Sequence, residues 1–116
     1  MTYEPYDVVV VPFPFTDRHT SKRRPALVLS DRDAFNEEVG QAVLAMITSR
    51  KNPPWPLDVP IEELDTAGLP SPSLVRMKLF TLDQQLILRK AGQLGAEDER
   101  NVRAILGRVL GFPTAN

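Results

Sequence analysis

Two short polar groups stand at the ends of apolar segments, and their side chains suit the binding of phosphate. Arg24 directly precedes Pro25 and an apolar run, and Thr48 and Ser49 close a second apolar segment. A guanidinium group is a planar fork of donors that matches a phosphate, and a hydroxyl adds a further donor. These residues form a candidate phosphate-binding pair that needs no metal. More commonly, an arginine at such a position is simply a solvated charge, and a threonine at a strand end serves local capping or strand formation.

Cysteine and histidine are scarce, which limits the chemistry that the chain can carry out. The sequence has no cysteine and one histidine, His19. Disulfides, thiol nucleophiles and metal sites built from thiolates or several histidines are therefore excluded. The carboxylates are scattered, so we expect no metal and no cofactor. His19 stands in a polar loop, and an imidazole that titrates near pH ~6.5 is a candidate for proton transfer.

Positive charge is concentrated in two segments, although the net charge is only −1. Residues 17–24 and residues 76–90 each contain four basic residues against one aspartate, whereas residues 58–65 are acidic. The two basic segments are candidates for one shared face that attracts nucleic acid. Ordinary surface charge is the alternative, because a charged fraction of 25% is average.

Short strands are expected through most of the chain, which contains 11 prolines and 6 glycines and has the length of a single domain, residues 1–116. The expected strands are residues 7–13, 24–30, 41–49, 57–61, 73–80 and 85–94, with polar connections at 16–23 and 31–40. The first strand is β-branched at nearly every position, which predicts that both of its faces are covered. Pro60 restricts the fourth strand to the edge of a sheet.

One helix is expected at the C-terminal end. Its apolar face consists of residues spaced three and four apart, namely Val102, Ile105, Leu106, Val109 and Leu110. Acidic residues at 97–99 favour the start of the helix, and Gly111 is a plausible C-terminal cap.

The order of these motifs resembles the MazF/PemK family of type II toxin–antitoxin toxins. The resemblance begins with D-V-V-V-V-P-F-P-F from residue 7, K-R-R-P-A-L-V-L-S from residue 22 and I-T-S from residue 47. Later segments that follow the family pattern are Gly68–Leu69, residues 72–76, residues 79–83 and residues 88–94. The similarity therefore spans nearly the whole chain, in order.

The resemblance implies a mainly β (α+β) fold, a small SH3-like β-barrel of antiparallel strands with a C-terminal α-helix. It implies a metal-independent, sequence-specific endoribonuclease that cleaves single-stranded RNA or mRNA and leaves 2′,3′-cyclic phosphate and 5′-hydroxyl ends. The implied partners are single-stranded RNA, a cognate antitoxin with an acidic, partly disordered tail, and a second copy of the chain. No segment has the ~20 apolar residues of a membrane span, so a cytoplasmic location is expected.

The family's catalytic arginine and threonine correspond to Arg24 and Thr48, and His19 is a third candidate whose alternative role is contact with RNA. The residues expected to bind RNA are Lys22, Arg23, Ser49, Arg76 and Lys78. Trp55 is a candidate for stacking on a base, with packing inside a proline-rich loop as the alternative.

Some positions depart from the family pattern. Some members have a catalytic acidic residue at the position of Lys78. Family members also often have a basic residue just before the threonine that corresponds to Thr81, where this chain has Phe80. Tyr6 replaces a common glycine. A carboxylate partner for Arg76 is therefore not identified from the sequence.

Two further readings stay open. The related CcdB toxins have the same architecture and poison DNA gyrase, chiefly through the C-terminal helix, which here has no evident exposed aromatic anchor. A degenerate member that only binds RNA or antitoxin is the other reading. For the dimer, an apolar surface around Leu74, Val75 and Leu79 and part of the C-terminal helix are both candidate interfaces. The cleavage sequence is not predicted.

Overall fold

The computed structural model describes residues 2–13 and 22–113. The strands of this part of the chain are β1 (Asp7–Pro12), β2 (Arg23–Val28), β3 (Gln41–Ser49), β4 (Val59–Pro60), β5 (Ser73–Asp83) and β6 (Arg89–Gln93). The helices are α1 (Glu37–Val39), α2 (Leu64–Ala67) and α3 (Ala96–Leu110), with short helical turns at Arg32–Asn36 and Gln84–Leu86. His19 lies outside the described residues.

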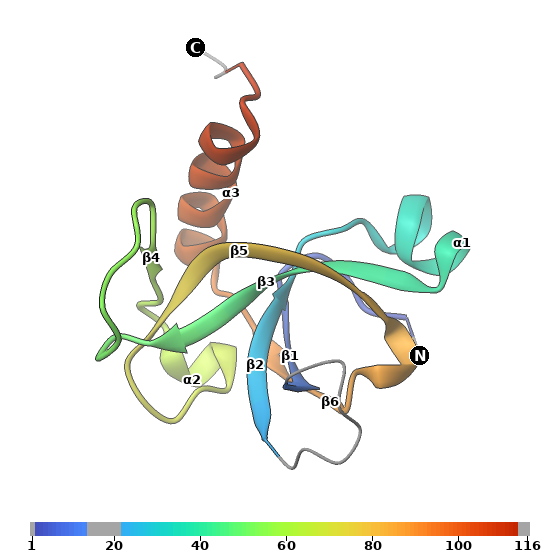
Figure 1. The fold of residues 1–116 in the computed structure, drawn as a ribbon, viewed down its shortest axis with the longest axis horizontal. Helices are drawn as coiled ribbons and strands as arrows, with labels where there is room; N and C mark the ends of the chain where they lie inside the picture. The colour runs from blue at the N-terminus through green and yellow to red at the C-terminus, as the bar shows by residue number, and fades with distance from the viewer. Residues whose placement is uncertain (1, 14–21, 114–116) are drawn as a thin grey trace.

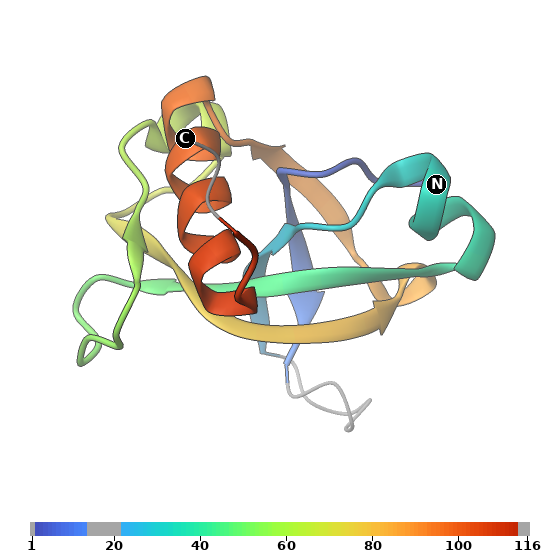
Figure 2. The ribbon, with the colours of Figure 1, turned by 90° about the horizontal axis from the view of Figure 1, so that it is seen from above.

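The six strands form one antiparallel sheet in the order β4-β5-β3-β2-β1-β6. The sheet curls into a half-barrel, with α3 standing at one end and α1 at the other (Figures 1 and 2). This arrangement confirms the predicted fold class. β4 occupies an edge of the sheet, as Pro60 requires, because proline cannot donate a ladder hydrogen bond.

The first strand is covered on both faces, as its run of valines predicted. Val8 belongs to one buried cluster, together with Val102 of α3 and Ala67 of α2. Val9 and Val11 belong to the other buried cluster. All three valines have no solvent exposure. Alternate residues therefore support two separate cores, and β1 with its neighbour β2 is held firmly between them.

Three segments differ from the sequence-based expectation. Residues 31–40 contain the turn Arg32–Asn36 and α1, and Asp31 caps this region by accepting hydrogen bonds from the amides of Asp33 and Ala34. The expected strand at 85–94 is shorter, because Asp83 caps the helical turn Gln84–Leu86 before β6 begins. The preceding strand, β5, continues to Asp83 rather than ending at residue 80.

The predicted apolar face of α3 is only partly packed. Val102 is fully buried, whereas Val109 and Leu110 are 37% and 47% exposed. The C-terminal half of the helix extends beyond the curled sheet (Figure 1), so its last turn has no described sheet surface to cover. Helical spacing identified the element, but it did not identify how far the supporting sheet reaches.

The start of α3 is fixed by a buried carboxylate. Asp98 has no solvent exposure and accepts hydrogen bonds from the backbone amides of Glu62 and Glu63, at 3.0–3.2 Å. Two amide donors thus make three hydrogen bonds to the buried carboxylate, which satisfies its polar oxygens. Asp98 thereby ties α3 to the segment between β4 and α2.

Candidate active site

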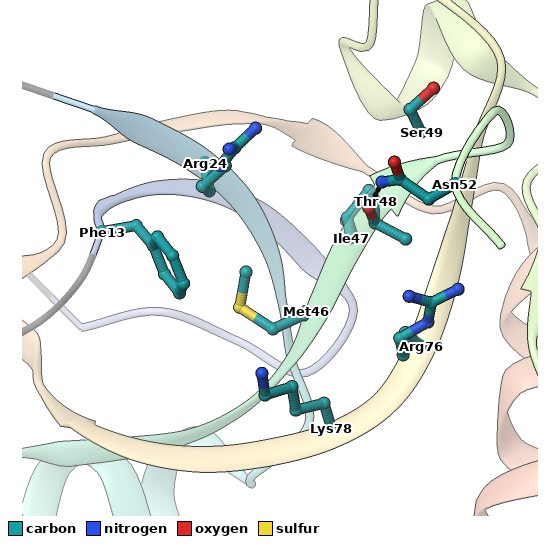
Figure 3. A pocket seen from close by; sticks show the side chains of 9 residues that line it. All are labelled: Phe13, Arg24, Met46, Ile47, Thr48, Ser49, Asn52, Arg76 and Lys78. Atoms are coloured by element: carbon teal, nitrogen blue, oxygen red, sulfur yellow. Dashed lines mark hydrogen bonds between the residues drawn. The ribbon is translucent and has the colours of Figure 1, made fainter. Parts of the chain in front are cut away.

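A pocket of about 350 Å³ lies where β2, β3 and β5 approach one another. Figure 3 shows the side chains that line it, which are Phe13, Arg24, Met46, Ile47, Thr48, Ser49, Asn52, Arg76 and Lys78. Five of these residues were singled out from the sequence. The sheet therefore brings together groups that are more than 50 positions apart in the chain.

Arg24 is held at the rim of the pocket by the strand that it begins. It faces Val11 of β1 in the sheet register, and Pro25 faces Val10. The next three residues of β2 are fully buried, which fixes the strand and its first residues. The Arg24 side chain is exposed, its guanidinium carbon lies 5.9 Å from the centre of the Phe13 ring, and it forms no ion pair with another described residue. Its donors are therefore available to an anion.

Thr48 is half-buried near the end of β3, where it pairs with Leu74 of β5. Its Oγ1 accepts a hydrogen bond from Nδ2 of Asn52, which Figure 3 draws as a residue of the same pocket. Because Asn52 occupies an acceptor site of the hydroxyl, the Thr48 O–H remains free to donate to a ligand. Asn52 was missed by sequence reasoning. Its position four residues after Thr48, in a turn before two prolines, is the only signal that points to it.

Ser49 lines the same pocket from the last position of β3. Its hydroxyl accepts a hydrogen bond from the amide of Lys51 at 3.1 Å. Ser49 therefore supports the turn that carries Asn52.

Arg76 is held by the loop between β3 and β4. Its Nε and Nη2 donate to Oδ1 and Oδ2 of Asp58 at 3.2 and 3.0 Å, and Nη2 also donates to the carbonyl of Pro53 at 2.8 Å. The guanidinium carbon lies 5.0 Å from the centre of the Trp55 ring. Nη1 has no hydrogen bond to another described residue, and Arg76 lines the pocket.

Asp58 is the carboxylate partner that the sequence did not identify. Its side chain is 9% exposed, and the Trp55 amide donates to Oδ2 at 2.8 Å. Burial alone raises the pKa of Asp58, but the hydrogen bonds from Arg76 and from the Trp55 amide, with the charge of Arg76, hold that pKa below its usual value of 3.8. The carboxylate that pairs with Arg76 therefore comes from the loop between β3 and β4, and it is ionised at neutral pH.

An irregularity in β5 accompanies the two basic residues of that strand. Ala45 of β3 pairs with Leu79, but the next residue, Met46, pairs with Arg76. Met77 and Lys78 are thus extra residues on β5, and such bulges bend a strand and redirect its side chains. Lys78 is exposed, lines the pocket and forms no ion pair within the described residues.

The remaining predicted residues lie elsewhere. Lys22 and Arg23 are exposed but do not line this pocket. Trp55 is 46% exposed, with its ring against Arg76. Residues 2–13 and 22–113 contain no group of three or more histidine, aspartate or glutamate side chains placed to hold a metal ion. The helices described in the structure are too short or too polar to cross a membrane.

The sequence matches the family described as "PemK-like, MazF-like toxin of type II toxin-antitoxin system" over residues 4–110. No curated protein matches the chain.

Solved structures share the fold over nearly the whole chain. MazF (Form-I) from Deinococcus radiodurans is 26% identical, with a TM-score of 0.73 and coverage of 96% of this chain and 98% of that one. An endoribonuclease in complex with its cognate antitoxin, from a mycobacterial species, is 16% identical, with a TM-score of 0.76 and 98% coverage of both chains. The toxin MazF-mt6 of Mycobacterium tuberculosis is 21% identical, with a TM-score of 0.71 and coverage of 93% and 99%.

Proposed function

Because the chain belongs to the PemK-like, MazF-like toxins of type II toxin–antitoxin systems, we propose that it is an endoribonuclease that cleaves single-stranded RNA without a metal ion. The observation that carries this proposal is that Arg24 and Thr48 line one pocket although they come from different strands. A free guanidinium group and a free hydroxyl donor at one site suit a phosphodiester.

The reaction uses a nucleophile that RNA itself supplies. The 2′-oxygen attacks the adjacent phosphorus, and the bond from phosphorus to the 5′-oxygen of the next nucleotide breaks. The 2′-hydroxyl loses a proton and the leaving 5′-oxygen gains one, so the products are a 2′,3′-cyclic phosphate and a 5′-hydroxyl. The protein has to orient these atoms, transfer the protons and stabilise the negative charge of the transition state.

Arg24 is assigned to charge stabilisation, and Thr48 to holding a phosphate oxygen. The hydrogen bond from Asn52 to Thr48 Oγ1 directs the hydroxyl proton away from Asn52 and toward the pocket. Asn52 is thus a positioning residue. Arg76 and Lys78 line the pocket from β5, and their positive charges attract RNA phosphates.

Proton transfer requires a group beyond the described pocket lining, which includes no carboxylate or imidazole. His19, which lies between β1 and β2 in the sequence and outside the described residues, is the candidate for this role. If it acts as an acid or base, His19→Ala will flatten the pH–rate profile near the imidazole pKa. An unchanged profile would remove His19 from the mechanism.

The partners follow from the same proposal. The cationic pocket suits an acidic segment of a cognate antitoxin, which would compete with RNA for it. Cleavage of mRNA would take place in the cytoplasm. For the homodimer, Val75 is fully buried inside the protomer, whereas Val109, Leu110 and Phe112 at the end of α3 are exposed. This difference favours α3 over the β5 surface as the dimer interface.

One experiment tests the function directly. Purified protein is incubated with single-stranded RNA in excess chelator, and the ends of any fragments are mapped. We expect cuts with cyclic phosphate and 5′-hydroxyl ends. Cleavage that stops in chelator contradicts metal independence, and intact RNA contradicts the proposal as a whole.

The gyrase-poison reading is retained because one sequence-based statement about α3 was wrong. Phe112 is 62% exposed directly after the helix, so an aromatic anchor is present there. Trapping of gyrase on DNA together with intact RNA would support that reading. Binding of RNA with neither activity would support a degenerate member.

A further inference from the structure

A second, smaller pocket lies on the other side of Arg24 from the site described above. It has a volume of about 240 Å³, and its lining includes Arg23, Arg24, Arg89, Leu69 and Pro70. A third pocket of about 180 Å³ lies between the two and shares Arg24, Thr48 and Ser49 with the first pocket and Leu69 and Pro70 with the second. The three pockets therefore adjoin one another around Arg24.

The sheet register explains why Arg89 lies beside the second pocket. In β1, Val10 faces Pro25 of β2 on one side and Arg89 of β6 on the other. Arg24 pairs with the next residue, Val11, so it lies two strands from Arg89, a backbone separation of about 10 Å, and its side chain points to the opposite face of the sheet. This separation suits contact with different phosphates of one strand rather than with a single phosphate. The sequence placed Arg89 in a basic segment but assigned no role to it.

The charges of this second pocket are not neutralised by neighbours. Arg23 and Arg89 are exposed, and neither forms an ion pair with another residue in the described ranges. The next residue, Lys90, contrasts with them because its Nζ lies 3.1 Å from Oδ1 of the buried Asp7. Arg89 is therefore the residue of β6 whose charge is available to a ligand.

The apolar wall of the pocket is rigid. Gly68 has a φ of +72°, and a Cβ atom there would lie 2.1 Å from the carbonyl oxygen of Ala91 in β6. The turn after α2 thus touches β6 backbone to backbone, and Leu69 is only 7% exposed. A fixed apolar surface beside free guanidinium groups matches a nucleotide, which has a flat base and a charged phosphate.

We propose that the second pocket, with Arg23, Arg89, Leu69 and Pro70 in its lining, binds nucleotides of the RNA that flank the scissile phosphate. This inference rests on the proposed ribonuclease function. The flanking base packs on Leu69 and Pro70, and Arg89 contacts a phosphate beyond the one held by Arg24. An acidic antitoxin segment is the competing occupant, and the test below separates the two.

The test compares Arg89→Ala with wild type and with Arg32→Ala, an exposed arginine of the Arg32–Asn36 turn outside all three pockets. RNA oligonucleotides that carry a 2′-deoxy nucleotide at the mapped cut site bind without being cleaved. We expect Arg89→Ala to weaken binding of a long oligonucleotide about fivefold, and to lower the slope of log Kd against log salt by about 0.7. Binding of an oligonucleotide trimmed to the two nucleotides at the cut site is expected to stay unchanged, as is all binding by Arg32→Ala.

Arg89→Lys retains the charge and is expected to keep most of the salt dependence. Equal binding of the long oligonucleotide by wild type and Arg89→Ala overturns the proposal, even if RNA is cleaved normally. If no RNA is cleaved, the same binding measurement with unmodified RNA still tests the second pocket, so the failure of the function and the failure of this inference are distinguishable. If Arg89→Ala loses binding to an acidic peptide but binds RNA as wild type does, the proposal is also overturned.

Discussion

Arg76 and Asp58 form a two-pronged ion pair, with Nε to Oδ1 at 3.2 Å and Nη2 to Oδ2 at 3.0 Å, between β5 and the loop before β4. Both side chains are nearly buried, at 12% and 9% exposure. The pair orders the loop that carries Asn52 and Trp55, and it leaves Nη1 of Arg76 without a hydrogen bond to another described residue. The two residues therefore couple the stability of the loop to the geometry of the candidate site.

Asp58→Asn is expected to destabilise the fold by about 1–3 kcal/mol near neutral pH, because it removes the charge that pairs with Arg76. The pKa of Asp58 is lowered in the folded state, so its contribution is present above its usual pKa of 3.8 and is lost as pH falls through the folded value. The difference between wild type and the variant should therefore shrink in acid. Urea unfolding at about pH 7 and about pH 3 measures it, and an equal difference at both pH values would contradict the ion pair's role.

Arg24→Ala is expected to lower kcat for RNA cleavage about 100- to 1,000-fold, because one donor to the transition state is lost. Stability should change by no more than about 0.5 kcal/mol, since the side chain is exposed. Arg32→Ala is the matched control and should cleave like wild type. A well-folded Arg24→Ala protein that still cleaves RNA or stops growth would sink the assignment of Arg24.

Thr48→Val keeps the shape of the side chain but removes the hydroxyl that accepts from Asn52. We expect kcat to fall about 100-fold, whereas Thr48→Ser, which keeps the hydroxyl, should stay within a few-fold of wild type. Single-turnover cleavage of one mapped RNA site measures both variants. If the valine and serine variants cleave equally well, the hydroxyl has no part in the reaction.

Gly92→Ala is expected to destabilise the protein by about 1–3 kcal/mol, because the added Cβ would lie 2.5 Å from backbone atoms of Thr66 and Ala67. The matched control is Gly107→Ala in α3, where a Cβ has no atom within 4 Å. That change should stabilise the helix by about 0.5–1 kcal/mol. Urea unfolding measures the change in the free energy of unfolding, which should have opposite signs in the two variants. An unchanged free energy in Gly92→Ala would show that β6 and α2 are free to separate.

Leu110→Asp is expected to convert the proposed homodimer, about 26 kDa or twice the 13.0 kDa of one chain, into monomers, because Leu110 lies in the exposed apolar end of α3. Light scattering coupled to size-exclusion chromatography measures the mass. Leu88→Asp, at an equally exposed leucine before β6, is the control. Monomers from Leu88→Asp and dimers from Leu110→Asp would place the interface at the other edge of the sheet.

The sequence by itself determined the elements whose signals are local. The valine run of β1 predicted coverage on both faces, Pro60 predicted an edge strand, and helical spacing predicted α3. Arg24 and Thr48 were predicted to bind phosphate because each stands at the end of an apolar segment, and the family resemblance then implied that they are the catalytic pair. The strand and helix signals require only neighbouring residues.

Tertiary structure alone decided which distant groups meet. Asp58 and Arg76 are separated by 18 positions, and only the loop over β5 makes them partners. The extra residues of β5, and the pairing of Val10 with both Pro25 and Arg89, depend on sheet register, which no local pattern fixes. The exposed end of α3 has the same origin, because the spacing of apolar residues gives a helix its face, whereas the extent of the sheet beneath it decides how much of that face is buried.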